Sequence, residues 1–148
     1  MSDDDALPEF GERAPGVPPT ERPGAYGIAL DRARRRVAVM RTPLGDFLPG
    51  GGSGDGETEL ETLRREVLEE CGRDVEIGRR LGAAMEYVIA ERGGSFAKRC
   101  AFYEIRLGER LPGPTEPDHA LAWVPIDEAL AGLAHGSQRW ALRVAVQP

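Results

Sequence analysis

The sequence predicts a mixed β-sheet with helices packed on its faces. Short apolar runs with strand-like alternation occur before and after one long segment, residues 57–71, that contains no Gly or Pro. This segment is rich in Leu, Glu and Arg, a composition typical of a helix, and Gly72 follows it as a stop. A chain of 148 residues is expected to form one domain.

The first 23 residues differ in composition from the rest. They are rich in Asp, Glu and Pro and show no apolar periodicity, so residues 1–23 are expected to form an extended or disordered N-terminal arm. The single domain is expected to cover residues 24–148. Its first strand is predicted at residues 26–30 and its second at 37–40, with a basic turn between them.

The remaining elements are read from alternation, turn residues and helix starts. They are a short run at 47–48 before the Gly-rich segment, strands at 75–81, 85–90, 98–107 and 121–124, a turn at 91–95, a helix over 128–134, and a last helix capped by Ser137 that runs toward Val146.

Charge and composition exclude several classes of protein. The formal net charge is −6, whereas a protein that binds a nucleic-acid polymer usually carries a basic stripe, so polymeric nucleic acid is not an expected partner. No apolar run reaches the roughly 18 residues that cross a membrane, and the acidic N-terminus resembles no targeting signal, so no membrane association and a cytoplasmic location are expected. Cys71 and Cys100 lack the spacing of a zinc site and are interpreted as small apolar residues.

The segment GGGSGDGET at residues 50–58 has the glycine spacing of a phosphate-binding P-loop. However, Glu57 stands where that motif requires a lysine, and a carboxylate there would repel the phosphates. The segment is therefore not a P-loop.

On a helical wheel, the apolar and acidic side chains of residues 57–71 fall on different arcs. The apolar arc, expected to face the core, contains Leu60, Leu63, Val67, Leu68 and Cys71. The acidic arc contains Glu59, Glu66, Glu69 and Glu70. Like charges three or four residues apart destabilise a helix by about 0.2–0.5 kcal/mol per pair. A divalent cation would offset this repulsion, because Mg²⁺ and Mn²⁺ prefer carboxylate and carbonyl oxygens. A solvated acidic face with ion pairs inside the helix is the alternative.

The pattern Gly51-x5-Glu57-x7-Arg65-Glu66-Val67-x-Glu69-Glu70-x-Gly72 resembles the signature of the Nudix hydrolases, G-x5-E-x7-R-E-U-x-E-E-x-G-U, in which U is a bulky aliphatic residue. Residues 48–51 and 123–130 also resemble elements that flank the signature in that family. Three positions depart from the family pattern. Gly54 stands where many members carry an extra glutamate in the loop. Arg73 replaces the last aliphatic residue, and Ala120 stands where many members have a glutamate that Glu116, Asp118 or His119 could replace.

The resemblance implies an α/β/α sandwich with a mixed β-sheet and the activity of a Mg²⁺-dependent pyrophosphohydrolase, with Mn²⁺ as another possible ion. The expected substrate is a small-molecule nucleotide, a nucleoside diphosphate linked to another moiety, with nucleoside triphosphates as one option. Water activated by the metal would cleave the phosphoanhydride. The implied metal ligands are Glu66, Glu69, Glu70 and the Gly51 carbonyl. The same glutamates are the candidate catalytic residues, with Glu66 or Glu70 as the base.

The resemblance also implies that Glu57 pairs with Arg65 and supports the signature, and that the glycines bring carbonyls to the metal. Further candidates for substrate binding are Arg41, Phe47, Lys98, Arg99 and Glu116. Tyr87 and Trp123 could also stack on a base, although aromatic residues of a sheet usually belong to the core. No second motif decides the substrate.

Two other classes of function fit the sequence less well. A catalytically silent Nudix-fold module that binds nucleotides or regulates another protein is the alternative, although such modules usually lose signature glutamates, and all four are present here. A calcium-stabilised domain is disfavoured because the EF-hand spacing is absent. A homodimer is a further expectation from the family.

Overall fold

The structure is a computed structural model that describes residues 7–148, so residues 1–6 of the expected N-terminal arm lie outside the described range. Its elements are, in chain order, β1 (Glu9–Gly11), β2 (Thr20–Ile28), β3 (Arg36–Thr42), β4 (Gly45–Phe47), β5 (Gly50–Gly52), α1 (Glu59–Cys71), β6 (Arg73–Ile89), β7 (Ser95–Arg110), β8 (Ala120–Pro125), α2 (Ile126–Gly132) and α3 (Gly136–Val146). None of these three helices has the length and apolar character needed to cross a membrane.

The strands form two sheets. One has five strands in the order β1-β6-β7-β2-β5, and the other has three in the order β4-β3-β8. The five-stranded sheet is mixed, because β2 runs parallel to β7 and β1 parallel to β6, whereas β6–β7 and β2–β5 are antiparallel. The mixed sheet predicted from the sequence is confirmed.

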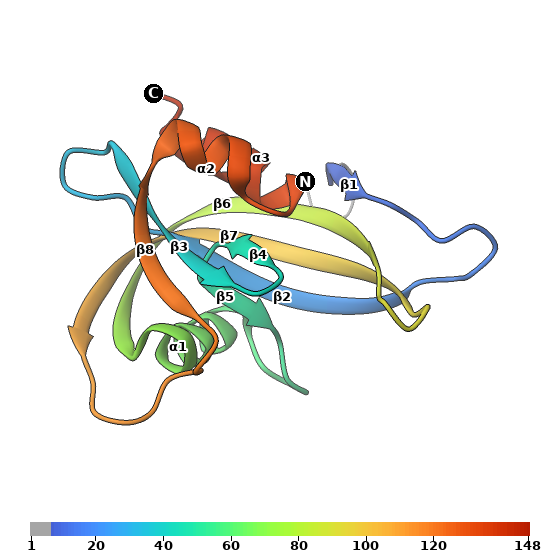
Figure 1. Ribbon diagram of the computed structural model, residues 1–148, viewed down its shortest axis with the longest axis horizontal. Coiled ribbons are helices and arrows are strands. Elements are labelled where there is room, and N and C mark those ends of the chain that lie inside the picture. Colours follow the sequence, from blue (N-terminus) through green and yellow to red (C-terminus); the bar gives the residue numbers. More distant parts are fainter. Residues whose placement is uncertain (1–6) are drawn as a thin grey trace.

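Helices cover both sides of the sheets, with α1 on one side and α2 and α3 on the other (Figure 1). Two apolar clusters correspond to these two sides. One contains Phe102, Leu133 and Leu142 and lies between the sheets and the two C-terminal helices. The other contains Leu63 and Val67 of α1. The molecule is therefore a three-layer α/β/α sandwich.

Part of the expected N-terminal arm pairs with the sheet. Strand β1 lies beside β6, with Glu9 opposite Met85, and β2 already begins at Thr20. This pairing uses the backbone at a sheet edge, so it leaves no apolar periodicity in the sequence. The sheet thus begins before residue 24, where the sequence places the start of the domain.

Two other elements differ from expectation. The strands predicted at 75–81 and 85–90 form one long strand, β6, whose register shifts on both sides of Arg80. Gly82, with a φ of 134°, lies at one of these irregularities and lets the strand continue. Helix α3 begins at Gly136 after His135, and Ser137 does not cap it through its side chain. The Ser137 N–H instead donates to the Glu86 carboxylate at 2.9 Å.

The buried face of α1 is also shifted relative to the predicted one. Leu63 and Val67 are fully buried, but Leu60 and Leu68 are 41% and 43% exposed, so their assignment to the core was wrong. The buried residues include the polar Thr62 and the acidic Glu70. The helix is thus turned so that one of its glutamates faces the protein interior.

Candidate active site

Local capping fixes both ends of α1. The Thr58 hydroxyl accepts a hydrogen bond from the Glu61 N–H, and the Glu61 carboxylate accepts one from the Thr58 N–H. This capping box satisfies two N–H groups that a helix start leaves unpaired. Gly72 ends the helix in the left-handed conformation, with φ 65°. The acidic residues therefore have a fixed rotation about the helix axis.

Strand β5 lies beside α1 and consists of three glycines. Gly50, Gly51 and Gly52 pair with residues of β2, so the start of the Gly-rich segment is an ordered strand. A Cβ atom on Gly50, whose φ is 143°, would lie 2.2 Å from the Ala25 carbonyl oxygen. A Cβ on Gly24 would lie 2.7 Å from the Gly51 carbonyl oxygen. Only glycine permits these close approaches.

Arg65 joins the Gly-rich segment to the acidic face of α1. Its guanidinium donates to Glu57 at 2.6 and 2.9 Å and to the Gly52 carbonyl at 2.9 Å. It also donates to Glu66 at 3.0 Å and to Glu69 at 3.2 Å. Hydrogen bonds from Arg65 lower the pKa of Glu57 to about 2. One arginine therefore offsets the repulsion of three carboxylates.

Glu70 and Glu66 lie against the first two glycines of β5. The Glu70 side chain is 9% exposed, and its Oε1 accepts a hydrogen bond from the Gly50 N–H at 2.8 Å. Burial raises the pKa of Glu70 to about 8 despite this bond, and the charge of Glu66 adds to the increase. Burial also raises the pKa of Glu66, whose carboxylate carbon would lie 2.5 Å from a Cβ on Gly51. The carboxylates of Glu66 and Glu70 thus lie close together in a partly buried site.

The loop before β8 brings two further groups to this place. The Glu116 N–H donates to the Glu69 carbonyl at 3.0 Å, and the Glu116 carboxylate contributes to the raised pKa of Glu70. His119 Nε2 lies 3.9 Å from Glu70 Oε2, and its Nδ1 lies 3.5 Å from Glu116 Oε2. Nδ1 is buried and has no hydrogen-bond partner among the described residues. From the sequence, His119 is expected only as one of three residues that could replace the glutamate absent at Ala120.

The predicted metal ligands are close together but are not preassembled. Within residues 7–148, no three His, Cys, Asp or Glu side chains are arranged to hold a metal ion. Arg65 holds Glu66 and Glu69, and the Gly50 N–H holds Glu70. The chemistry of the donors nevertheless fits a hard divalent cation, because carboxylate oxygens are the ligands that Mg²⁺ and Mn²⁺ prefer. Burial raises the pKa of Glu66 and of Glu70, and neighbouring carboxylates add to both increases.

A cavity of about 470 Å³ lies beside β5. Gly52 and Ser53 form part of its wall, and Lys98 of β7, Arg22 and Tyr26 of β2 line it as well. We call it the Lys98 cavity. Its volume is within the range of small-molecule sites, about 300–1,000 Å³. Two cationic side chains thus lie in a cavity that borders the Gly-rich segment.

Comparison with known proteins identifies the family. The family model described as the NUDIX domain matches residues 20–144. The chain belongs to the Nudix hydrolase family. An 8-oxo-(d)GTP phosphatase of Mycolicibacterium smegmatis is 33% identical to this Nudix domain over 109 residues, which are 72% of this chain and 32% of that protein. The chain thus spans about a third of the length of this relative.

Solved Nudix-type structures share the fold. The E. coli ORF135 protein matches with a TM-score of 0.66 and 19% identity, over 86% of this chain and 89% of that one. The MutT protein of Methanosarcina mazei Go1 matches with a TM-score of 0.65 and 17% identity, over 88% and 96% of the two chains. At these identities the likeness shows the fold alone.

The Nudix fold separates the two basic residues that the sequence grouped together at β7. Successive side chains of a strand point to opposite faces. Lys98 therefore shares a face with Cys100 and lines the Lys98 cavity, whereas Arg99 points to the side of α1. Glu59 lies at the start of α1 on that side. Burial raises the pKa of Glu59, but hydrogen bonds from Arg80 and the charge of Arg99 outweigh burial and lower the pKa. Of these two residues, Lys98 alone lines that cavity and stays a candidate for contact with a substrate there.

Three substrate-binding candidates remain. Glu116 lies beside Glu69 and Glu70, and Arg41 and Phe47 lie outside this cavity. Arg41 is half-exposed, 3.8 Å from Asp46 and 3.9 Å from Glu128. Phe47 packs edge-on against His135, with ring centroids 5.1 Å apart. Neither residue lines the Lys98 cavity. Among the described residues, no ion pair joins Arg41 to Glu66, Glu69 or Glu70, although its backbone pairs with Ala120, next to His119.

Gly51→Ala is expected to lower hydrolytic activity at least tenfold with little change in the free energy of unfolding. The added methyl group would displace the Glu66 carboxylate, and a shift of about 1 Å in a catalytic group can cost about 100-fold in rate. Steady-state kinetics and thermal unfolding measure the two effects. Gly54→Ala is the matched control, because its methyl group would meet Glu57 at an ordinary 3.5 Å. Equal activity of the two variants would contradict the position assigned to Glu66.

Proposed function

We propose that the chain hydrolyses a phosphoanhydride bond of a nucleotide and uses a divalent cation, Mg²⁺ or Mn²⁺. The observation that carries this proposal is the position of the Glu66 and Glu70 carboxyls beside Gly50 and Gly51, where burial raises the pKa of both and repulsion from neighbouring carboxylates adds to the increase. A bound cation would remove this repulsion, because an opposite charge favours the ionised form. Membership of the Nudix family supports the same chemistry.

Glu66, Glu69 and Glu70 would hold the cation, with the Gly51 carbonyl and Glu116 as further oxygen donors. When bound, such an ion lowers the pKa of a water molecule and neutralises charge on the phosphate oxygens. To bind the cation, Glu66 and Glu69 would have to release their hydrogen bonds with Arg65. Arg65 retains two other partners, the Glu57 carboxylate and the Gly52 carbonyl, which keep it in place.

The proposed step is the attack of water on phosphorus. A bond forms between the water oxygen and phosphorus, and the bond from phosphorus to the bridging oxygen breaks. The proton of the water passes to Glu66 or Glu70, and the leaving group, pyrophosphate or the nucleoside monophosphate according to the phosphorus attacked, departs with the bridging oxygen. Oε1 of Glu70 is engaged by the Gly50 N–H, so Oε2, 3.9 Å from His119, is the oxygen that can accept a proton.

The nucleotide would occupy the Lys98 cavity, which borders the Gly-rich segment. The Mycolicibacterium smegmatis relative is named an 8-oxo-(d)GTP phosphatase, and the 33% identity supports a purine nucleoside triphosphate as the substrate class. A triphosphate is a nucleoside diphosphate linked to one further phosphate, so it satisfies the family's general substrate. The cationic Lys98 and Arg22 would face its negative charge.

Lys98→Ala is expected to raise KM about tenfold and to leave kcat within about threefold, since a hydrogen bond to a charged group contributes about 1.5–3 kcal/mol. Initial rates over a range of substrate concentrations separate the two constants. Arg92→Ala, in the exposed turn before β7, is the control. A fall in kcat without a change in KM would show that Lys98 acts elsewhere than in substrate binding.

The test of the function is a product assay. The protein is incubated with Mg²⁺ or Mn²⁺ and a panel that contains 8-oxo-dGTP, the common nucleoside triphosphates, ADP-ribose, dinucleoside polyphosphates and nucleotide sugars, and the products are separated by chromatography. We expect one class, the purine triphosphates, to be cleaved to a nucleoside monophosphate and pyrophosphate, and EDTA to stop the reaction. Turnover that continues in EDTA would refute the metal-dependent reaction.

A catalytically silent binding module is the second candidate. No turnover of any compound, together with a rise in melting temperature on addition of a nucleotide, would favour it. The presence of Glu57, Glu66, Glu69 and Glu70 argues for the enzyme. The homodimer and the cytoplasmic location stay predictions from the sequence.

A further inference from the structure

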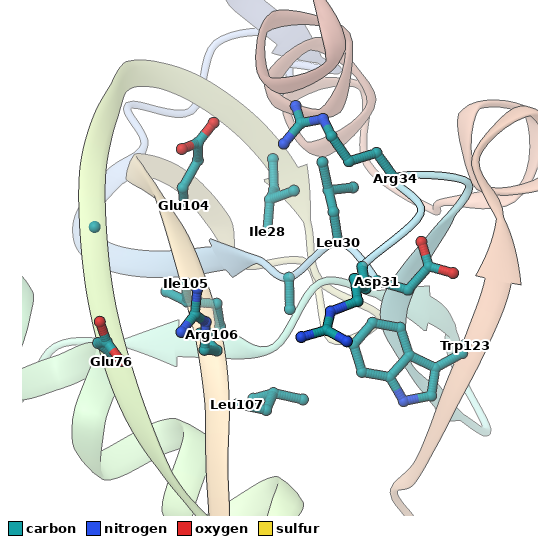
Figure 2. A pocket seen from close by; sticks show the side chains of 13 residues that line it. Ile28, Leu30, Asp31, Arg34, Glu76, Glu104, Ile105, Arg106, Leu107 and Trp123 are labelled. Carbon is teal, nitrogen blue, oxygen red and sulfur yellow. The ribbon is translucent and has the colours of Figure 1, made fainter.

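A second cavity, of about 830 Å³, lies away from the glutamates. Its walls come from the end of β2, from β6, from the second half of β7 and from β8. We call it the Trp123 cavity. Figure 2 shows Trp123 on one side, Arg106 and Leu107 across from it, and Ile28 and Leu30 between them. Its volume is that of a small-molecule site, and its walls combine apolar and charged side chains.

The Trp123 cavity is separate from the candidate active site. No residue of its walls belongs to the group of Glu66, Glu69, Glu70, Glu116 and His119 or to the Lys98 cavity. Strand β8 leads from one site to the other. At about 3.3 Å per residue in a strand, the four residues from His119 to Trp123 correspond to about 13 Å.

Trp123 gives the cavity a surface for a planar ring. Its side chain is 41% exposed, which is high for the largest apolar residue type, whereas Ile28, which also lines the cavity, is buried. The Arg36 guanidinium donates to the Trp123 carbonyl at 3.3 Å, and β8 pairs with β3 along its length, so the backbone of Trp123 is held. Nucleic-acid bases stack on such aromatic side chains.

Two cationic groups of the cavity have no side-chain partner among residues 7–148. Neither Arg32 nor Arg106 forms a side-chain hydrogen bond or an ion pair with another residue in the 7–148 range. Arg34, by contrast, donates to the Ala145 carbonyl at 3.2 Å. Arginine binds phosphate in a planar, two-pronged geometry and stays charged at all physiological pH values. The cavity can therefore take an anion.

Acidic residues limit the charge of that anion. Asp31, Glu76 and Glu104 also line the cavity. The Asp31 carboxylate accepts hydrogen bonds from backbone N–H groups of the following turn, and Glu104 pairs with Arg79 at 3.0 Å. These three carboxylates disfavour a triphosphate but tolerate a single phosphate near the arginines.

We propose that the Trp123 cavity binds a nucleoside monophosphate, with the base stacked on Trp123 and the phosphate between Arg32 and Arg106. Such a molecule combines a planar ring with one compact anionic group, as the walls require. Hydrolysis at the glutamates is not needed for this binding, so the two sites can be tested independently. A nucleoside monophosphate is also the product of the proposed reaction, which would place a product-binding site outside the active site.

The test is a binding measurement on the full chain in EDTA, with GMP and AMP as probes. Equilibrium dialysis is expected to show one saturable site, and tryptophan fluorescence is expected to change on binding. Trp123→Ala and Arg106→Ala are each expected to weaken binding at least tenfold, and circular dichroism checks that both variants fold. Arg110→Ala, on an exposed part of β7 outside the cavity, is the matched control and should bind as the parent does.

The separate parts of the ligand are controls for its chemistry. Guanosine, inorganic phosphate and GTP are each expected to bind at least tenfold more weakly than GMP. The proposal is overturned if no saturable binding occurs, if GTP binds as tightly as GMP, or if binding survives both Trp123→Ala and Arg106→Ala. Loss of binding in Lys98→Ala with no loss in Arg106→Ala would assign the monophosphate to the Lys98 cavity and would also overturn it.

Discussion

Glu70→Gln is expected to lower kcat about 10²–10⁴-fold, the usual contribution of a general base, without lowering the free energy of unfolding. The amide cannot accept the proton of water and is a poorer ligand for a divalent cation. Its oxygen can still accept the hydrogen bond from the Gly50 N–H, so the local fold is kept. The substitution also removes a buried carboxylate that is repelled by Glu66 and Glu116.

Single-turnover and steady-state rates, measured beside thermal unfolding, separate catalysis from stability for this variant. Glu91→Gln, in the exposed turn after β6, is the matched control. A Glu70→Gln protein that retains activity within about threefold, well short of the 10²–10⁴-fold expected for a general base, would remove Glu70 from the reaction. A loss of activity accompanied by a large fall in melting temperature would assign Glu70 a structural role instead.

Arg65→Ala is expected to affect stability and activity together. It deletes hydrogen bonds to Glu57, Glu66, Glu69 and the Gly52 carbonyl and leaves the carboxylates to repel one another. Hydrogen bonds with charged partners contribute about 1.5–3 kcal/mol. Because the Arg65 side chain is 36% exposed, solvent screening reduces this to about 1–2 kcal/mol of unfolding free energy in total. Activity should fall about 100-fold, because the Gly-rich segment, which Arg65 ties to α1 through Glu57 and the Gly52 carbonyl, loses its fixed position beside the glutamates.

Chemical denaturation and initial rates measure both effects of Arg65→Ala. Arg65→Lys should recover part of the stability but little of the activity, because an ammonium group cannot bridge Glu57, Gly52 and the helix at once. Full activity of Arg65→Lys would show that the charge alone matters and that the arrangement of hydrogen bonds does not.

Local pattern was sufficient to predict the helix that carries the acidic residues. The absence of Gly and Pro over residues 57–71 and the stop at Gly72 match α1, which spans Glu59–Cys71. The pairing of Glu57 with Arg65 is also present. Both features depend on residues close in sequence, where helical geometry leaves few alternatives.

The rotation of α1 could not be predicted from the same pattern. The wheel places Leu60 and Leu68 in the core, but which arc of a helix is buried depends on the strands that it meets. Here β5 consists only of glycines, so the side of α1 that carries Glu70 can approach the backbone closely. Glu70 is therefore buried at a position where the apolar pattern alone would predict a residue such as leucine.

The two cavities were beyond prediction for a different reason. Lys98 and Arg99 read as a pair in the sequence, yet the alternation of a strand sends them to opposite faces of the sheet. The Trp123 cavity combines residues from β2, β6, β7 and β8, which are far apart in the chain. Such a site exists only after the sheets are assembled, so no local spacing indicates it.

Binding of Mn²⁺ to the metal-free protein, followed by electron paramagnetic resonance, tests the central claim most directly. The parent protein is expected to take up Mn²⁺, and Glu66→Gln and Glu70→Gln are each expected to bind it at least tenfold more weakly, while Glu91→Gln binds it normally. Uptake that is unchanged in both glutamate variants would contradict the assignment of the metal site. No uptake by the parent protein, with nucleotide hydrolysis that continues in EDTA, would contradict the whole account of the reaction.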